Sequence, residues 1–307
     1  MTWVLKAFIQ RAIGLLPVSE RINYTFQKRI TKNLPVSDET LDEKIMLAAK
    51  RVELFLKFGG GISLADAKFL EFGAGWDMIG PLTMFALGVG KQTLLDITPH
   101  LRFELINNAL DRLRKRTARF IEITGKTSRT FSDGDVLSKK DLLERFAIDY
   151  RAPLDAANTG FPANSIDFIC TNSTLEHIPA PALLPIMNES YRILKHGGVL
   201  CHLIDMKDHY SYFDKSISKY NFLKFSKSFW KIFNSPLQYQ NRLRLSQYRS
   251  IIKNAGFEIV YEEVDEANSA ELQELRSIKL HPDFKNKFTE PDLSAKIYRV
   301  VAKKIVH

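Results

Sequence analysis

The chain alternates between two patterns of apolar residues. Short apolar runs, typical of buried strands, occupy residues 68–72, 92–96, 147–150, 165–171 and 198–204. Apolar residues that recur every three or four positions predict the helices between them, at 79–87, 101–116, 141–146 and 182–194. Such alternation predicts crossover connections and therefore an α/β fold, with a doubly wound, mostly parallel sheet and helices on both faces.

The two ends of the chain depart from this alternation. Residues 1–17 and 38–58 have the spacing of amphipathic helices, and Gly59-Gly60-Gly61 ends the second one. Near the carboxyl end, strand patterns at 256–262 and 296–305 predict that an antiparallel strand completes a seven-stranded sheet. We divide the chain into an N-terminal helical cap at 1–65, a Rossmann-like core at 66–206, an aromatic and basic lid insertion at 207–244, and a completion of the sheet at 245–307.

Composition narrows the class of protein. A chain that is 45% hydrophobic and 26% charged is typical of a folded protein, and its apolar runs are too short for a transmembrane helix. The two cysteines, Cys170 and Cys201, lie in apolar strands, which favours a reducing, cytoplasmic setting. The N-terminus lacks the features of a secretory signal. A net charge of +9 favours anionic partners or reflects a solvated basic surface.

The most informative stretch is Lys68 to Leu82, which reads KFLEFGAGWDMIGPL. A glycine turn after a strand brings backbone close to a ligand at a helix N-terminus. Dinucleotides require a third glycine, where this chain has Met78, and the Gly-Lys-Ser/Thr ending of a phosphate loop is absent. The sequence therefore predicts a ligand without a phosphate at this loop and disfavours an oxidoreductase.

Four blocks in order carry a family resemblance. They are Glu71-Phe72-Gly73-Ala74-Gly75, Asp96 in LLDIT, the run LEHIP…SYRILKHGGVL, and AGFEI at Ala255–Ile259. They resemble class I S-adenosylmethionine-dependent methyltransferases, especially the branch that acts on small molecules and glycans. The resemblance covers about residues 68–205 and implies S-adenosylmethionine as the cofactor.

The resemblance also implies roles for cofactor-binding residues. Glu71, Gly73, Ala74 and Gly75 would wrap the methionine part of S-adenosylmethionine, with Glu71 near its ammonium group. Asp96 at the end of the second strand would accept both ribose hydroxyls, as a carboxylate can. On the residues alone, the glycines could be simple turn formers, and Asp96 could cap the following helix.

The later blocks supply the other side of the predicted pocket. By the same resemblance, Asp155 would accept from the exocyclic amine of adenine, and Ala156 would contribute backbone to that loop. Asn172, Glu176 and His177 follow the fourth strand and would shape the cofactor pocket.

The residues after the fifth strand are candidates for the chemistry. A hydroxyl acceptor needs a base near neutral pH, and histidine supplies one. We predict His209 as this base, with Asp208 or Asp205 as the carboxylate that orients it. Packing or capping of the insertion is the alternative for Asp208 and His209. Asp205, Asp208 and His209 are also oxygen and nitrogen ligands, but without a further fixed partner no metal is predicted.

These observations favour O-methylation of a small molecule, a glycan or a lipid-linked acceptor. An RNA methyltransferase and a non-catalytic S-adenosylmethionine-binding scaffold are the alternatives. Nucleic acid is disfavoured because Thr171-Asn172-Ser173-Thr174 replaces the Asn/Asp-Pro-Pro-aromatic motif of base-nitrogen methyltransferases, and Cys170 lacks a Pro-Cys setting.

The insertion contains the segment NFLKFSKSFWKIF at 221–233, in which Lys224, Lys227 and Lys231 recur at helical spacing among aromatic residues. Two interpretations remain open. The segment is either a lid with buried aromatics and solvated lysines, or a surface that contacts a membrane interface together with the N-terminal helix. The second interpretation predicts a cytoplasmic protein peripheral to the inner face of a membrane.

Overall fold

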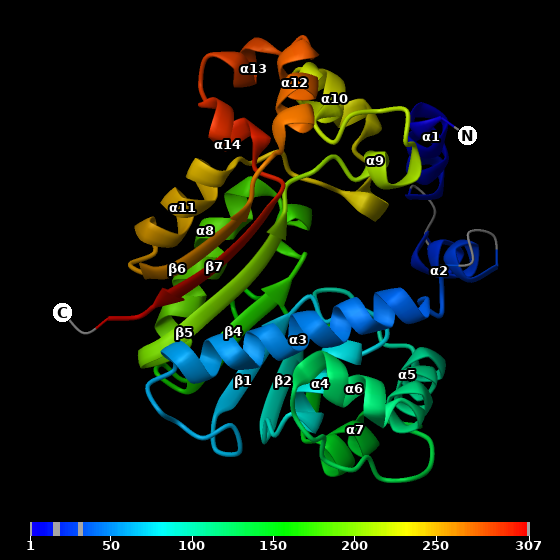
Figure 1. Ribbon diagram of the computed structural model, residues 1–307, viewed down its shortest axis with the longest axis vertical. Helices are drawn as coiled ribbons and strands as arrows, with labels where there is room; N and C mark the ends of the chain where they lie inside the picture. The colour runs from blue at the N-terminus through cyan, green and yellow to red at the C-terminus, as the bar shows by residue number, and fades with distance from the viewer. Residues whose placement is uncertain (1, 15–18, 30–32, 306–307) are drawn as a thin grey trace.

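The computed structural model describes residues 2–14, 19–29 and 33–305, and its centre is a seven-stranded sheet (Figure 1). The strand order is β3-β2-β1-β4-β5-β7-β6, and β7 alone runs antiparallel to its neighbours. The strands are β1 (Lys68–Phe72), β2 (Lys91–Leu95), β3 (Ile148–Arg151), β4 (Ile166–Asn172), β5 (Leu194–Asp205), β6 (Glu258–Asp265) and β7 (Ile297–Lys303). The predicted fold class is therefore confirmed, including the antiparallel late strand.

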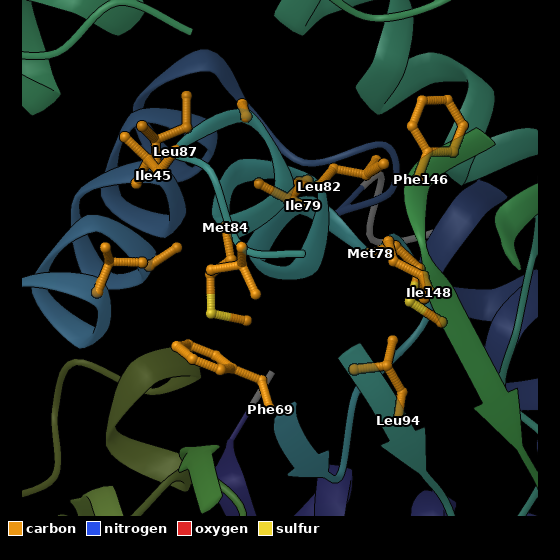
Figure 2. Packing of buried hydrophobic residues seen from close by; sticks show 14 of the residues in the cluster. Ile45, Phe69, Met78, Ile79, Leu82, Met84, Leu87, Leu94, Phe146 and Ile148 are labelled. Carbon is orange, nitrogen blue, oxygen red and sulfur yellow. The ribbon is translucent and has the colours of Figure 1, made fainter. Parts of the chain in front are cut away.

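One face of the sheet is covered by helices that share a single apolar core. They are α3 (Asp38–Phe58), α4 (Ile79–Ala86), α5 (Phe103–Lys115), α6 (Thr117–Thr124) and α7 (Lys139–Phe146). Ser37 caps α3 by accepting from the amide of Thr40. Ile45 of α3, Phe69 of β1 and Met84 of α4 lie in this core (Figure 2). The chain thus buries the apolar stripe of α3 directly on the strands that lead into the glycine loop.

The opposite face carries α8 (Ala180–Ile193) and α11 (Leu245–Asn254). Their buried side chains form a second core with the other side of β1, β4, β5 and β7. Residues alternate between the two cores along each strand, because successive side chains point to opposite faces of a sheet. In β5, Cys201 lies in the first core and Leu200 in the second.

A third cluster lies beyond the sheet, at the end where β5 finishes (Figure 1). Its helices are α1 (Trp3–Gly14), α9 (Tyr210–Phe213), α10 (Lys227–Phe233), α12 (Ser269–Ser277), α13 (Pro282–Lys285) and α14 (Glu290–Ser294). The sequence analysis assigned no helices to residues 266–295, so the last three are additions to it. Short amphipathic pieces of four to nine residues carry too little periodicity to be recognised.

The predicted N-terminal cap contributes to two different parts of the molecule. Helix α1 packs on the insertion, where Trp3 contacts the rings of Tyr210 and Phe233, whereas α3 belongs to the first core. Helix α2 (Ser19–Arg29) lies between them in the chain. Residues 1 and 15–17 of the predicted first helix lie outside the described residues. No helix in the described part of the chain has the length and apolar character needed to cross a bilayer.

Candidate active site

The predicted cofactor residues meet at one edge of the sheet. Strands β1, β2, β3 and β4 are parallel, so their carboxyl ends, and the loops that follow them, face the same way. Ligands of open α/β sheets bind outside these ends, near the point where strand order reverses. Here the reversal lies between β1 and β4.

Glu71 near the end of β1 is held by an ion pair that the sequence analysis missed. Arg51 of α3 donates from Nη1 to Glu71 Oε1 over 2.7 Å, and the two side chains are only 8% and 6% exposed. Glu71 Oε2 has no hydrogen-bond partner among the described residues. Gly80 leaves room for the arginine, because a Cβ there would lie 2.6 Å from Arg51 Nη2. One oxygen of Glu71 is therefore fixed and the other remains an open acceptor.

The glycine loop needs both of its glycines. Gly73 and Gly75 have φ values of 77° and 75°, in the left-handed region that favours glycine. A Cβ on Gly73 would lie 2.4 Å from the side chain of Thr174, so this loop touches the loop after β4. Asn172 is half-buried at the end of β4, and its carbonyl accepts from Thr174 Oγ1. Gly75 instead faces open space, where a ligand can approach the backbone.

The absent third glycine has a structural explanation. Met78 adopts a φ of 56° and is fully buried, so it takes the left-handed conformation without being glycine. Asp77 forms an ion pair with Lys44 of α3 and accepts from the amide of Ile79 at the start of α4. The loop end is thus fixed by side-chain bonds.

Asp96, just after β2, is buried and already holds two donors. The hydroxyl of Tyr150 donates to its Oδ2 over 3.0 Å, and the Ala74 amide also donates to the carboxylate. Burial raises the pKa of Asp96 to about 7, although these two hydrogen bonds oppose the rise. The carboxylate therefore titrates within the physiological range.

The predicted adenine loop lies beside Asp96. The amide of Leu154 donates to the Asp96 carbonyl over 2.9 Å, which sets the loop against the end of β2. Asp155 is exposed and accepts from the Ala157 amide over 2.8 Å, forming a local turn, and Ala156 between them is half-buried. The predicted contacts with adenine stay a prediction.

His209 lies beyond the end of β5, which finishes at Asp205. Its side chain is 11% exposed, its Nε2 is 3.7 Å from Asp205 Oδ2, and that nitrogen makes no hydrogen bond among the described residues. The Gln240 side chain accepts from the His209 amide and fixes the backbone. Burial, together with nearby His177 and lysine charges, lowers the pKa of His209 to about 3, so the ring is neutral.

Of the two carboxylates predicted to orient His209, Asp205 faces it. Asp208 is fully buried and accepts from the Tyr210 amide over 2.9 Å and from Asn221 Nδ2 over 3.1 Å. These bonds tie the start of α9 to the segment at 221, so Asp208 holds the insertion together. The hydroxyl of Tyr212 donates to Asp205 Oδ2.

Glu176 and His177 come together with His209. Glu176 is 1% exposed, its Oε1 accepts from the Asp205 amide, and burial raises its pKa well above the usual range. His177 is exposed and its Nδ1 lies 2.7 Å from the carbonyl of Tyr239. One ligand atom from each of Glu176, His177 and His209 lies within 4.8 Å of the others. Both residues thus lie beside His209, and the cofactor contacts predicted for them stay a prediction.

Three residues of the site were not predicted from the sequence, although the sequence pattern around two of them was informative. Arg51 lies at helical spacing from the buried Ala48 and Phe55, so a charge was visible on an apolar stripe. Tyr150 ends the strand predicted at 147–150. Gly80 left no signal, because its role depends on where the Arg51 side chain comes to lie.

A family profile described as a methyltransferase domain matches residues 137–202. No curated protein sequence is detectably similar to the chain.

Similar solved structures include an S-adenosylmethionine-dependent methyltransferase from Methanosarcina mazei, with 15% identity, coverage of 83% of this chain and 98% of that chain, and a TM-score of 0.45. The [4+2]-cyclase SpnF has 16% identity and a TM-score of 0.46, and the match covers 87% of this chain and 82% of that chain. Geranyl diphosphate C-methyltransferase from Streptomyces coelicolor A3(2) has 12% identity, coverage of 88% and 86%, and a TM-score of 0.46.

The strand order and the glycine loop agree with the resemblance to class I S-adenosylmethionine-dependent methyltransferases, and a methyltransferase-domain profile matches part of the chain. Together they support a methyltransferase that uses S-adenosylmethionine as its methyl donor. The residues present fit this cofactor. The unpartnered Glu71 Oε2 suits the ammonium group, Gly75 leaves space beside the loop, and the Asp96 carboxylate suits the ribose hydroxyls.

We expect Arg51→Met to destabilise the protein strongly, because it leaves the buried Glu71 carboxylate without its partner. The loss should be about 3–5 kcal/mol in the free energy of unfolding, measured by urea denaturation. Adding Glu71→Gln should recover most of it, since no buried charge then remains. A double variant no more stable than Arg51→Met would contradict the role assigned to the pair.

We expect the affinity for S-adenosylhomocysteine, the reaction product, to fall as pH drops below about 7. Hydroxyl donors favour the ionised carboxylate, and Asp96, with its pKa near 7, becomes protonated in the free enzyme as pH falls. Titration calorimetry at a series of pH values measures this dependence.

Asp96→Asn is the matched control. It should weaken binding about ten- to hundredfold at pH 8 and remove the dependence near pH 7. Its melting temperature at pH 8 without ligand should not fall, because ionising a group whose pKa is raised in the folded state costs stability at high pH. An unchanged pH profile would exclude Asp96 as the ribose ligand.

Proposed function

We propose that the enzyme methylates a hydroxyl group of a small molecule, a glycan or a lipid-linked acceptor, and that His209 accepts the proton of that hydroxyl. One observation carries this proposal. The buried Nε2 of His209 makes no hydrogen bond among the described residues, although it lies 3.7 Å from Asp205, at the end of β5. A buried nitrogen of this kind is suited to accept a hydrogen bond from a ligand.

The residues would act mainly by positioning. The cofactor supplies a methyl group on a positively charged sulfur, which is an excellent leaving group. In the transfer the acceptor oxygen forms a bond to the methyl carbon, the carbon–sulfur bond breaks with its electrons going to sulfur, and the hydroxyl proton moves to His209 Nε2. Holding the two reactants in line contributes much of the rate enhancement.

Asp205 would stabilise the charge that His209 gains in this step. The low pKa of His209, about 3, keeps the ring neutral and able to accept, but it also means a weak affinity for the proton. The Asp205 carboxylate lies near enough to stabilise the imidazolium as it forms. Tyr212 donates to the same carboxylate and holds it in place.

A second candidate for activating the hydroxyl is a divalent metal ion. Glu176 Oε2 and His209 Nε2 are buried and make no hydrogen bond with any residue that the structure describes, and Nδ1 of the exposed His177 lies 2.7 Å from the Tyr239 carbonyl. Two imidazoles and a carboxylate within 4.8 Å are a ligand set used by transition metals, and a backbone carbonyl on the second ring nitrogen is a frequent supporting contact. An ion bound there would take His209 Nε2 as a ligand, so the two candidates exclude each other.

We expect His209→Ala to lower methyl transfer by about a hundredfold or more and to leave the affinity for S-adenosylhomocysteine unchanged. The assay uses methyl-labelled S-adenosylmethionine and fractionated cell extract, and the fraction that becomes labelled also reveals the acceptor class. His196→Ala, an exposed histidine at the opposite end of β5, should behave as wild type. Full activity of His209→Ala would reject both candidates.

Dialysis against a chelator distinguishes the proposal of His209 as a base from the alternative of a bound metal ion. Under the base proposal, the treated enzyme keeps its activity. Binding of Co²⁺ is the independent readout: an absorption spectrum of coordinated Co²⁺ in wild type that His177→Ala and Glu176→Gln both lose would establish the metal site. Loss of activity on dialysis with recovery on adding the ion would then overturn the base.

The RNA alternative is tested by salt. An enzyme that binds RNA through many phosphates loses affinity steeply as salt rises, and the label would appear in the RNA fraction. Labelling of small molecules or lipids with a weak salt dependence supports the acceptor class proposed here.

A further inference from the structure

Two helices from opposite parts of the chain expose an apolar surface together. Leu5 and Phe8 of α1 are 51% and 50% exposed, and Phe229 and Ile232 of α10 are each 45% exposed. We call these four side chains the α1–α10 patch. Large apolar groups this exposed are ordinary when scattered, but a contiguous group indicates a binding surface.

The two helices that carry these side chains are bound to each other. The rings of Phe8 and Phe229 both contact Phe233, at centroid distances of 5.7 and 5.3 Å. Arg11 Nη1 donates to the carbonyls of Lys231 and Ile232, at 2.9 and 3.1 Å. The patch is therefore one surface formed by two helices.

The layer beneath the patch is a packed aromatic cluster. Trp230 and Phe233 are buried and contact Trp3 and Tyr210. The aromatic side chains of the insertion thus differ in exposure: Trp230 and Phe233 are buried in the cluster beneath the patch, whereas Phe229 is exposed. The exposed side chains are therefore supported by a packed layer of buried aromatic residues.

The charge around the patch has one sign. Lys224, Lys227 and Lys231 are exposed and form no ion pair with a carboxylate in the part of the chain that the structure describes. The sequence has no Asp or Glu between Lys215 and Phe257, and none in α1. Arg11 lies at the junction of the two helices. An apolar centre surrounded by unpaired cations is complementary to the interface of an anionic bilayer, where acyl chains meet negative headgroups.

We propose that the α1–α10 patch binds the surface of membranes that contain anionic lipid. Phe8, Phe229 and their neighbours would enter the boundary between headgroups and acyl chains, and the lysines would contact headgroup phosphates. The patch is also close to the reaction: Tyr210 follows His209 directly and donates from its hydroxyl to the Phe233 carbonyl over 2.7 Å. If the proposed function holds, this placement favours an amphiphilic acceptor presented at the membrane surface.

Flotation of the full chain with vesicles tests the proposal without any assay of activity. Wild-type protein should float with vesicles of phosphatidylcholine and phosphatidylglycerol and should not float with phosphatidylcholine alone. Lys227→Glu with Lys231→Glu should weaken partitioning by about tenfold or more, because each basic residue near the surface contributes about 1 kcal/mol. Phe229→Ser with Ile232→Ser should also weaken it, at every salt concentration.

Matched controls separate the patch from the overall charge and apolarity of the protein. Lys126→Glu with Lys253→Glu makes the same change in net charge at exposed positions elsewhere, and Leu137→Ser with Leu143→Ser removes two other exposed apolar side chains. Both should float as wild type does. Circular dichroism confirms that each variant is folded.

Three results would overturn the proposal. Wild-type protein that stays in the lipid-free fraction at low salt does not bind membranes. Equal losses in the patch variants and the controls would show attraction by net charge alone. Normal flotation of Phe229→Ser with Ile232→Ser would show that the apolar centre does not enter the lipid. Because flotation does not depend on the reaction, these results stand whether or not His209 is the base.

Discussion

The ion pair between Arg51 and Glu71 determines how the glycine-loop side of the site is built. It joins α3 to β1 with both side chains almost fully buried, and Glu71 lies two residues before Gly73, where the glycine loop begins. Removing two charges from water is costly, and close pairing is what offsets that cost. Because Arg51 also approaches within 3.7 Å of the Cys170 sulfur in β4, α3 is fixed against two neighbouring strands at once.

The loops at this edge depend on one another for their shape. Gly73 lies against Thr174, so the loop after β1 leaves no space for a side chain between itself and the loop after β4. Ala74 of the same loop donates to Asp96 after β2, and Tyr150 of β3 donates to Asp96 from the other side. Four strand ends are thus linked through one carboxylate and one close contact, which orients the groups before a ligand arrives.

Local patterns were sufficient to predict most of the core from the sequence. The helix at 38–58 and the strand at 68–72 have the predicted bounds, because a capping serine, a glycine stop and a continuous apolar run are short-range signals. The pairing of Arg51 with Glu71 and the meeting of His177 with His209 depend on contacts between residues distant in sequence. Spacing along one chain carries no information about such contacts, so the sequence did not distinguish Asp205 from Asp208 as the neighbour of His209.

The contacts of the third cluster, which contains α1 and the insertion, were even less predictable from the sequence. They join segments more than two hundred residues apart, as in the hydrogen bond from the Trp3 amide to Asp214. The cluster is joined to the sheet partly through Arg244, which is fully buried and donates to the Met206 carbonyl; its Nε and Nη1 have no hydrogen-bond partner among the described residues. Burial lowers the pKa of Arg244 to about 10, which reflects the cost of removing a cation from water.

The cost of burying a cation is offset differently beside the glycine loop and in the insertion. The glycine loop adjoins a buried cation that is paired with a carboxylate, Arg51 with Glu71, whereas the insertion holds the buried cation of Arg244 with the Met206 carbonyl. Arg244 also lies over the ring of Phe222, 5.2 Å from its centroid, so packing and backbone contacts hold the insertion where an ion pair holds the start of the glycine loop.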